Sequence, residues 1–194
     1  LEHEAKLAIA RAAASLVEPG MAVAVSAGST TYEVSRLLVE IPRLTVVTNS
    51  VPAAEIMYHA GRSDQTIILS GGVRTPSDAL VGPFAVNALR AVNVDIVFLG
   101  VHGMHEHAGF TTPNMLEAET NQALIETGGR LVVTADHTKW GITGVSTIAG
   151  LDRADIVITD EGLGAGARAI LEEQAGQLVL TGQADPMAAM SGVA

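Results

Sequence analysis

Residues Ser26-Ala27-Gly28-Ser29-Thr30-Thr31 follow the apolar run Met21–Val25 and precede a segment with helical periodicity, Thr30–Leu38. A buried strand is therefore expected to end in a short, hydroxyl-rich turn that opens a helix. The first N–H groups of a helix have no intrahelical acceptor and lie at the positive end of its dipole. The turn is thus a candidate anion site, and a phosphate group is the expected anion.

Short apolar runs alternate with helical patterns along the rest of the chain. The predicted strands are Ala22–Val25, Leu44–Val47, Thr66–Leu69, Asp95–Leu99, Leu131–Thr134, Asp155–Thr159 and Leu178–Leu180. Most are continuous Val, Ile and Leu runs, so both faces of the sheet are expected to be covered. The predicted helices are Glu2–Val17, Thr30–Leu38, Val51–His59, Pro83–Ala91, Asn114–Thr127 and Ala165–Gln174. This alternation predicts an α/β fold, a parallel-sheet sandwich with right-handed crossovers.

Several turn residues predict where helices begin and end. Thr30 to Glu33 has the spacing of a capping box. Thr112-Pro113 predicts a cap followed by a proline at the first helical position. Gly128-Gly129 predicts a helix end in the left-handed conformation.

Composition limits the class of protein. The 194 residues are 48% hydrophobic, which predicts one globular domain over residues 1–182, and the small, polar segment 183–194 is expected to be a flexible tail. The chain has no cysteine, which excludes disulfides and Cys-ligated zinc and favours a cytoplasmic location. No apolar stretch is long enough to predict a membrane span. A net charge of −10 predicts no direct binding of nucleic acid.

Small polar residues follow five predicted strands in succession. The segments are Ser26–Thr31, Thr48–Ser50, Ser70–Gly72 with Arg74, Gly100–Gly103 and Asp136–Lys139. Ordinary turn chemistry explains any one of these loops. However, the carboxyl ends of parallel strands share one edge, so five such loops together predict a site for a polar, anionic small molecule.

The His-rich segment His102–His107 offers imidazole and carboxylate groups that suit zinc. Its spacing matches no established metal motif, and the segment is predicted to be an exposed loop, so no metal and no cofactor are expected. His102, directly after a predicted strand, is instead a candidate hydrogen-bonding partner for a ligand. The fingerprints of P-loop, dinucleotide-binding and α/β-hydrolase proteins are absent from the sequence.

The polar loops occur in a characteristic order together with Leu80-Val81-Gly82-Pro83, Gly109-Phe110-Thr111-Thr112 with Glu117-Ala118, and Asp136-His137-Thr138-Lys139-Trp140-Gly141. From about Glu4 to Gly162 the chain resembles the carboxy-terminal sensor domain of DeoR-type bacterial transcriptional repressors. The resemblance implies a Rossmann-like fold similar to the ribose-5-phosphate isomerase-like group. It also implies a homo-oligomer that binds a phosphorylated sugar without catalysis. DNA binding would belong to an amino-terminal helix-turn-helix domain that the sequence, starting at Leu1, does not include.

The resemblance assigns roles to residues of the matching motifs. Those expected to hold the phosphate are Gly28, Ser29, Thr30 and Thr31; those expected to line the cleft are Asn49, Gly71 and Gly72; those expected around the sugar are Asp95, His102, Glu117 and Lys139. Two positions depart from the family pattern, which commonly has Asp in place of Ser26 and Lys in place of Asn121. The missing lysine implies either an effector with less negative charge or a substitute cation, Arg74.

Two other functions remain open from the sequence. A sugar-phosphate isomerase of related fold would need a carboxylate base and a polarising cation, which Glu117 or Asp136 could supply together with Lys139. A purely structural oligomerisation domain would leave the donor-rich loops without a role. The order of the motifs favours the sensor, and the chain is expected not to be an enzyme.

Overall fold

The seven predicted strands form one parallel sheet in the computed structural model, which describes residues 2–182. The sheet order is β12-β11-β9-β6-β1-β2-β3, and every neighbouring pair is parallel. The strands are β1 (Ala22–Val25), β2 (Thr45–Thr48), β3 (Thr66–Leu69), β6 (Ile96–Gly100), β9 (Arg130–Thr134), β11 (Ile156–Asp160) and β12 (Leu178–Thr181). Each predicted strand begins and ends within one residue of the observed strand. The expected tail, 183–194, lies outside the described residues.

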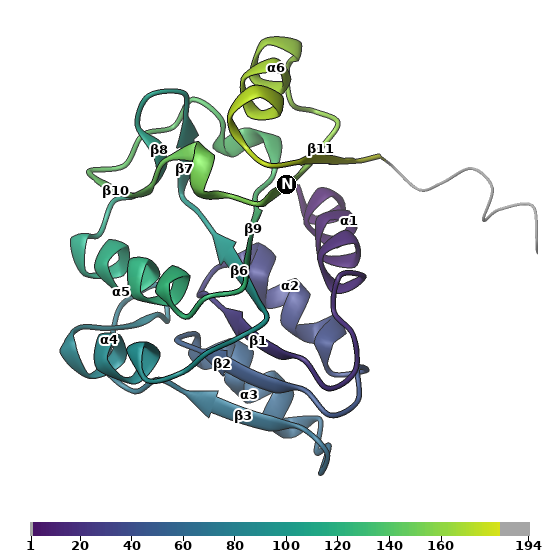
Figure 1. Cartoon of the computed structure of the whole chain (residues 1–194), viewed down its shortest axis with the longest axis vertical. Coiled ribbons are helices and arrows are strands. Elements are labelled where there is room, and N and C mark those ends of the chain that lie inside the picture. Colours follow the sequence, from purple (N-terminus) through teal and green to yellow (C-terminus); the bar gives the residue numbers. More distant parts are fainter. Residues whose placement is uncertain (1, 183–194) are drawn as a thin grey trace, which may run out of the picture.

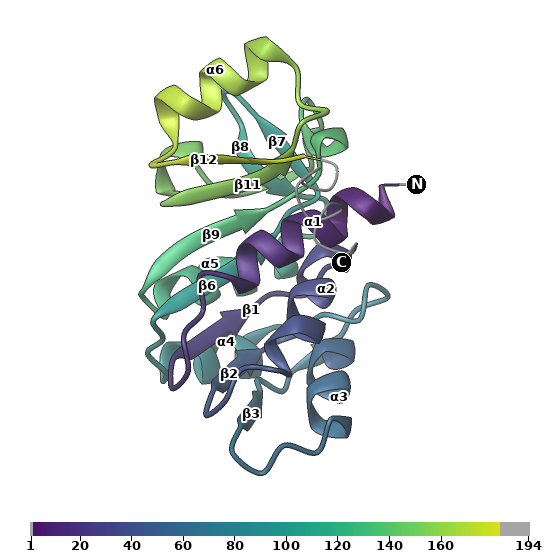
Figure 2. The same cartoon turned by 90° about the vertical axis from the view of Figure 1, so that its right-hand side faces the viewer.

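Helices cover both faces of this sheet (Figures 1 and 2). Those on one face are α1 (His3–Ala14), α2 (Ser29–Leu38) and α3 (Val51–His59); those on the other are α4 (Pro83–Arg90), α5 (Met115–Glu126) and α6 (Ala165–Gln174). Helix α1 ends before the predicted Val17 because Leu16 and Val17 donate to carbonyls three residues back, which tightens the last turn. No helix within residues 2–182 has the length and apolar content needed to cross a membrane.

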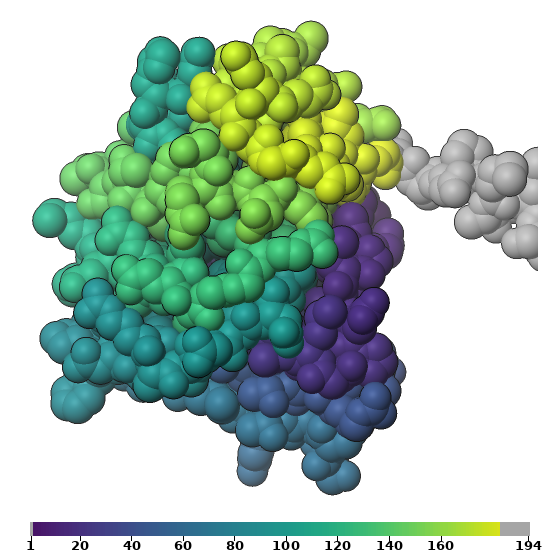
Figure 3. Space-filling view, viewed as in Figure 1, coloured from purple at the N-terminus to yellow at the C-terminus, as the bar shows by residue number. Residues whose placement is uncertain are grey.

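Two apolar layers fill the space between the sheet and its helices. Successive strand residues point to opposite faces, so Val23 and Val25 pack with Ile9 of α1, whereas Ala24 packs with Leu89 of α4. Phe98 of β6 is fully buried in the α1–α3 layer. Continuous apolar runs are thus explained by burial on both sides. The space-filling view shows one continuous body, with the blue part of the chain at the bottom and the yellow carboxy-terminal part at the top (Figure 3).

The edge strand β3 is an exception to the expected coverage. Ile68 is 37% exposed and Leu69 is 44% exposed, and Thr66 is exposed as well. Strand β3 has a neighbour, β2, on one side only. An edge strand with apolar exposed side chains is a surface suited to association.

Five short strands outside the main sheet were not predicted. They are β4 (Val73–Arg74) and β5 (Leu80–Val81), which form a hairpin, and β7 (Gly103–His105), β8 (Gly109–Thr112) and β10 (Ser146–Ala149), which form an antiparallel sheet. The prediction of an exposed loop over His102–His107 is wrong in part, because Gly103 and Met104 are buried in β7.

Two of the predicted caps are wrong and one helix end is confirmed. Helix α2 begins at Ser29 after Gly28, with no side-chain cap, so Thr30 does not open a capping box. The cap of α5 is Asn114, whose side chain accepts from two backbone N–H groups, rather than Thr112. Gly128 and Gly129 have φ of 87° and 73°, as the left-handed helix end requires.

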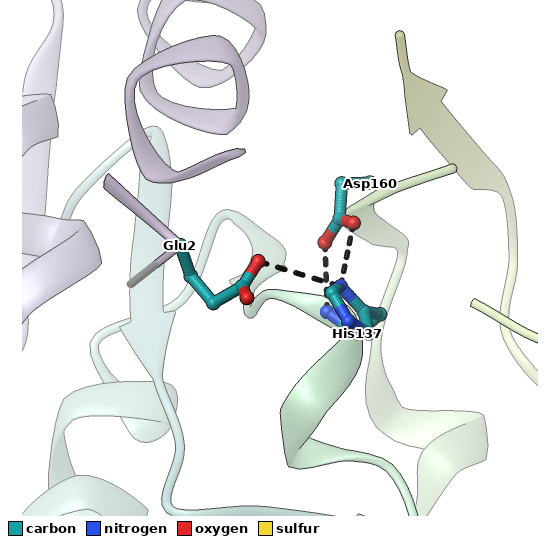
Figure 4. Close-up of side chains that lie close together, drawn as sticks. All are labelled: Glu2, His137 and Asp160. Atoms are coloured by element: carbon teal, nitrogen blue, oxygen red, sulfur yellow. Dashed lines mark hydrogen bonds and ion pairs between the residues drawn. The ribbon is translucent and has the colours of Figure 1, made fainter. Parts of the chain in front are cut away.

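A three-residue cluster joins the start of α1 to two strand ends (Figure 4). His137 opens the 3₁₀ turn η1 (His137–Lys139), and its Nδ1 lies 2.7 Å from Asp160 Oδ2 and 3.7 Å from Glu2 Oε2. Asp160 also accepts the backbone N–H groups of His137, at 2.7 Å, and Gly162, at 3.1 Å. Burial by itself would raise the pKa of Asp160, but these donors outweigh it and lower the pKa.

The two glycines after α5 give a matched test of packing. An alanine Cβ at Gly129 would lie 2.4 Å from the backbone of Asp95, whereas one at Gly128 would meet no atom within 4 Å. Both substitutions force a left-handed conformation, which costs about 1–2 kcal/mol. Gly129→Ala is therefore expected to lower the free energy of unfolding by about 1–3 kcal/mol more than Gly128→Ala. Urea unfolding of both variants measures the difference, and equal losses would contradict this account.

The lowered pKa of Asp160 predicts a pH-dependent contribution to stability. The carboxylate stabilises the fold above its ordinary pKa of 3.8, and this contribution is lost as the pH falls through the lower folded-state value. Asp160→Asn is expected to cost about 1.5–3 kcal/mol at pH 7, and less as the pH approaches 3. Urea unfolding at several pH values measures this, with Glu172→Gln on exposed α6 as the charge-matched control. Identical pH profiles for the two variants would refute the assignment.

Candidate functional site

A cavity of about 410 Å³ lies where β1, β6 and β9 end. Its lining combines segments far apart in the sequence but joined by the sheet. The lining residues are Ala27, Gly28, Ser29, Thr30, Pro76, Ser77, Gly100, Val101, His102, Thr112, Pro113, Asn114, Glu117, Asn121, Thr134, Ala135 and Lys139. Six residues predicted for the site are among them: Gly28, Ser29, Thr30, His102, Glu117 and Lys139.

The start of α2 contributes hydrogen-bond donors to the cavity. Gly28, at φ 155°, precedes the helix and supplies no side-chain cap, so the N–H groups that follow it keep their donor capacity. Ser29 is exposed, and Thr30 lines the cavity although it is buried. Thr31 lies behind them, fully buried, and its hydroxyl donates to Gly28 O at 3.1 Å. Its role is therefore to hold the turn in shape.

Lys139 brings a positive charge to the same cavity from η1. The buried Asp136 caps η1, because its carboxylate accepts from the backbone N–H of Thr138 at 3.0 Å and from the Thr138 hydroxyl. The carbonyl of Asp136 accepts from Lys139 N at 3.1 Å. Lys139 forms no ion pair with any residue between 2 and 182. Its ammonium group is therefore available to a ligand.

Glu117, in the first turn of α5, supplies negative charge to the same cavity. Its Oε1 accepts from the hydroxyl of Thr75, at 3.0 Å, and from that of Ser77, and its Oε2 accepts from Thr112 at 3.3 Å. Thr75 and Ser77 belong to the turn between β4 and β5. This carboxylate thus anchors the hairpin turn at the cavity, where Pro76 and Ser77 form part of the lining.

Asn121 and Thr134 also line the cavity, and the sequence did not single them out as site residues. Both are buried, and Thr134 Oγ1 has no hydrogen-bond partner among the described residues. Thr134 is the last residue of β9, so its place at the carboxyl end of a strand was the available signal. Asn121, noted only as a departure from the expected family pattern, brings a neutral amide to the cavity.

Ser26 and Asn49 support the site without lining it. The Ser26 hydroxyl accepts from Gly100 N at 2.9 Å, which ties the end of β1 to the end of β6. Asn49 accepts from Ala27 N at 3.1 Å and donates to Leu80 O at 3.1 Å, which joins three loops. Both side chains are almost fully buried, and their polar atoms form hydrogen bonds within the protein.

Four predicted site residues lie away from the cavity. Asp95 precedes β6, at the amino edge of the sheet, where its carboxylate accepts from Ala22 N at 2.8 Å. Arg74 is exposed and pairs with Asp78 at 2.7 Å, so it does not substitute for the missing lysine. Gly72 packs against β5, where a Cβ would lie 2.6 Å from a carbonyl oxygen, and Gly71 is exposed beside it.

Solved structures of similar fold include enzymes and translation factors. Ribose 5-phosphate isomerase A from Methanocaldococcus jannaschii matches with a TM-score of 0.53 and 18% identity, over 72% of this chain and 55% of the other. The eIF2B beta subunit from Chaetomium thermophilum matches with a TM-score of 0.53 and 18% identity, over 79% and 48%. At such identity the likeness shows the fold alone, and the predicted ribose-5-phosphate isomerase-like fold is confirmed.

Relatives in sequence are transcriptional regulators. The chain is 35% identical to an HTH-type transcriptional regulator, GlpR, of Haloferax volcanii, over 93% of this chain and 70% of the relative. It is 29% identical to a putative aga operon transcriptional repressor of Escherichia coli O157:H7, over 92% and 66%. It is 35% identical to the regulator FruR of Bacillus subtilis, over 80% and 61%. The chain thus spans about two thirds of the length of these relatives.

The family comparison agrees with the order of motifs. The model of the DeoR C terminal sensor domain matches residues 1–161, which include every lining residue of the cavity. The chain belongs to the DeoR C-terminal sensor domain family, and it is an effector-sensing regulatory domain.

Proposed function

We propose that the cavity binds a phosphorylated sugar and that this binding controls the DNA affinity of a regulator containing the domain. The observation that carries the proposal is the meeting of Lys139 and the uncapped start of α2 in one cavity. Free N–H groups and an unpaired ammonium group favour a phosphate oxygen. The domain would act in the cytoplasm, and as a sensor rather than as an enzyme.

The remaining lining residues suit the sugar itself. The Glu117 carboxylate accepts hydrogen bonds from hydroxyls. The Thr134 hydroxyl has no hydrogen-bond partner among the described residues. Asn121 and His102 add hydrogen-bond donors and acceptors. A ligand that offers one anionic group and several hydroxyls matches this set better than an apolar ligand does.

Control of DNA binding requires that the ligand distinguish two states of the protein. A ligand shifts an equilibrium only by its difference in affinity for the two arrangements. We propose that a homo-oligomer provides these arrangements, as the resemblance implied. The exposed apolar side chains of β3 support such association.

Sugar-phosphate isomerisation is the second candidate, because Glu117 and Lys139 line one cavity and offer a base and a polarising cation. Protein hydroxyls already donate to both Glu117 oxygens, which engages this carboxylate in anchoring the hairpin turn rather than in accepting a proton from a substrate. Asp136 lies outside the lining, and Thr138 occupies one of its oxygens. Turnover of a bound sugar phosphate at about 1 s⁻¹ or faster would favour the enzyme.

A thermal-shift screen of sugar phosphates tests the proposed function. A binding member at one hundred times its dissociation constant is expected to add about 2.7 kcal/mol to the free energy of unfolding. Lys139→Met is expected to weaken that binding by about 1–3 kcal/mol, since it removes a charge-assisted contact. Arg130→Met, at the amino end of β9, is the control and should bind as the wild type does. Absence of stabilisation by any phosphorylated sugar would refute the proposal.

A further inference from the structure

A second cavity, of about 510 Å³, adjoins the first. The two share Gly28, Ser29 and Ser77 in their linings. Helix α1 contributes His3 and Lys6 to the second cavity, and α1 contributes nothing to the first. Ser29 thus lies between a cavity that contains Lys139 and a cavity that contains Lys6.

The charges in the second cavity leave Lys6 uncompensated. The two carboxylates that line this cavity each form an ion pair with an arginine: Glu33 pairs with Arg36 at 3.0 Å, and Asp78 pairs with Arg74 at 2.7 Å. Lys6 is half-buried and forms no ion pair with the described part of the chain. A partly desolvated ammonium group with no counter-charge favours an anion beside it.

Lys6 and Lys139 are the only lysines in the sequence, and each lines one of the two cavities. Both cavities also include the exposed Ser29. We propose that the second cavity is a second anion subsite. The effector would then carry a negative group at each end, as a sugar bisphosphate or a phosphorylated sugar acid does. This inference rests on the proposed function and narrows the class of ligand.

Matched sugars test the inference by isothermal titration. Fructose 1,6-bisphosphate is expected to bind at least about tenfold more tightly than fructose 1-phosphate or fructose 6-phosphate, because one more charge-assisted contact forms. Lys6→Met is expected to abolish that preference and to leave binding of the monophosphates within about twofold. Lys6→Arg keeps the charge and should keep most of the preference, whereas Lys139→Met should weaken binding of the bisphosphate and of both monophosphates.

Two results would overturn the inference while the proposed function stands. One is binding of the monophosphates as tight as that of the bisphosphate. The other is an equal loss for all three sugars in Lys6→Met, which would mean that Lys6 and Lys139 share a single phosphate. Circular dichroism checks that each variant is folded.

A second measurement does not depend on the identity of the sugar. Crystals soaked in tungstate, a phosphate mimic with a strong anomalous signal, are expected to show one anion at Lys139 and another at Lys6. Lys6→Met should remove only the second. An anion at Lys139 alone would overturn the inference even if none of the fructose phosphates binds, and an anion at Lys6 that persists in Lys6→Met would identify it as an adventitious ion only.

Discussion

The shared direction of the seven strands is the constraint on which the site depends. Parallel pairing brings the ends of β1, β6 and β9 to one edge, although they are far apart in the sequence. Hydrogen bonds of buried polar side chains then fix the loops at that edge: Ser26 binds Gly100, and Asn49 joins Ala27 to Leu80. With these loops fixed, the start of α2 and the turn that carries Lys139 line a common cavity.

The main sheet was predictable because most of its strands are buried on both faces and are therefore continuous apolar runs, although β3 is exposed. Strands β4, β5, β7, β8 and β10 give no such signal, because none of them contains more than two consecutive apolar residues. Met104 illustrates the limit, since a single apolar residue among histidines is fully buried. The exposure of β3 could not be predicted from the sequence pattern either, because an apolar run does not reveal that its strand lies at the edge of a sheet.

The rule that a ligand site follows the strand ends holds for five of the six predicted residues that line the cavity; Glu117 reaches the cavity from α5 instead, and Arg74, after β3, does not reach it. Ser29, His102 and Lys139 satisfy that rule and line the cavity, whereas Asp95 precedes its strand and lies at the opposite edge. Thr134 ends β9 as an ordinary strand former, and Asn121 lies within a helix whose inward face the sequence does not define. Lys6 precedes the first strand, so only the packing of α1 beside α2 brings it near Ser29.

Helix α1 connects the two lysines that we propose bind the effector. Lys6 lies on α1, and Glu2, just before its first turn, contacts His137 of η1, the same turn that carries Lys139 (Figure 4). Asp160 holds His137 from the end of β11 through both its backbone N–H and its ring. A ligand in contact with both lysines would therefore act on the two sides of one junction. Such a ligand would favour only the arrangement of α1 and η1 that it binds more tightly.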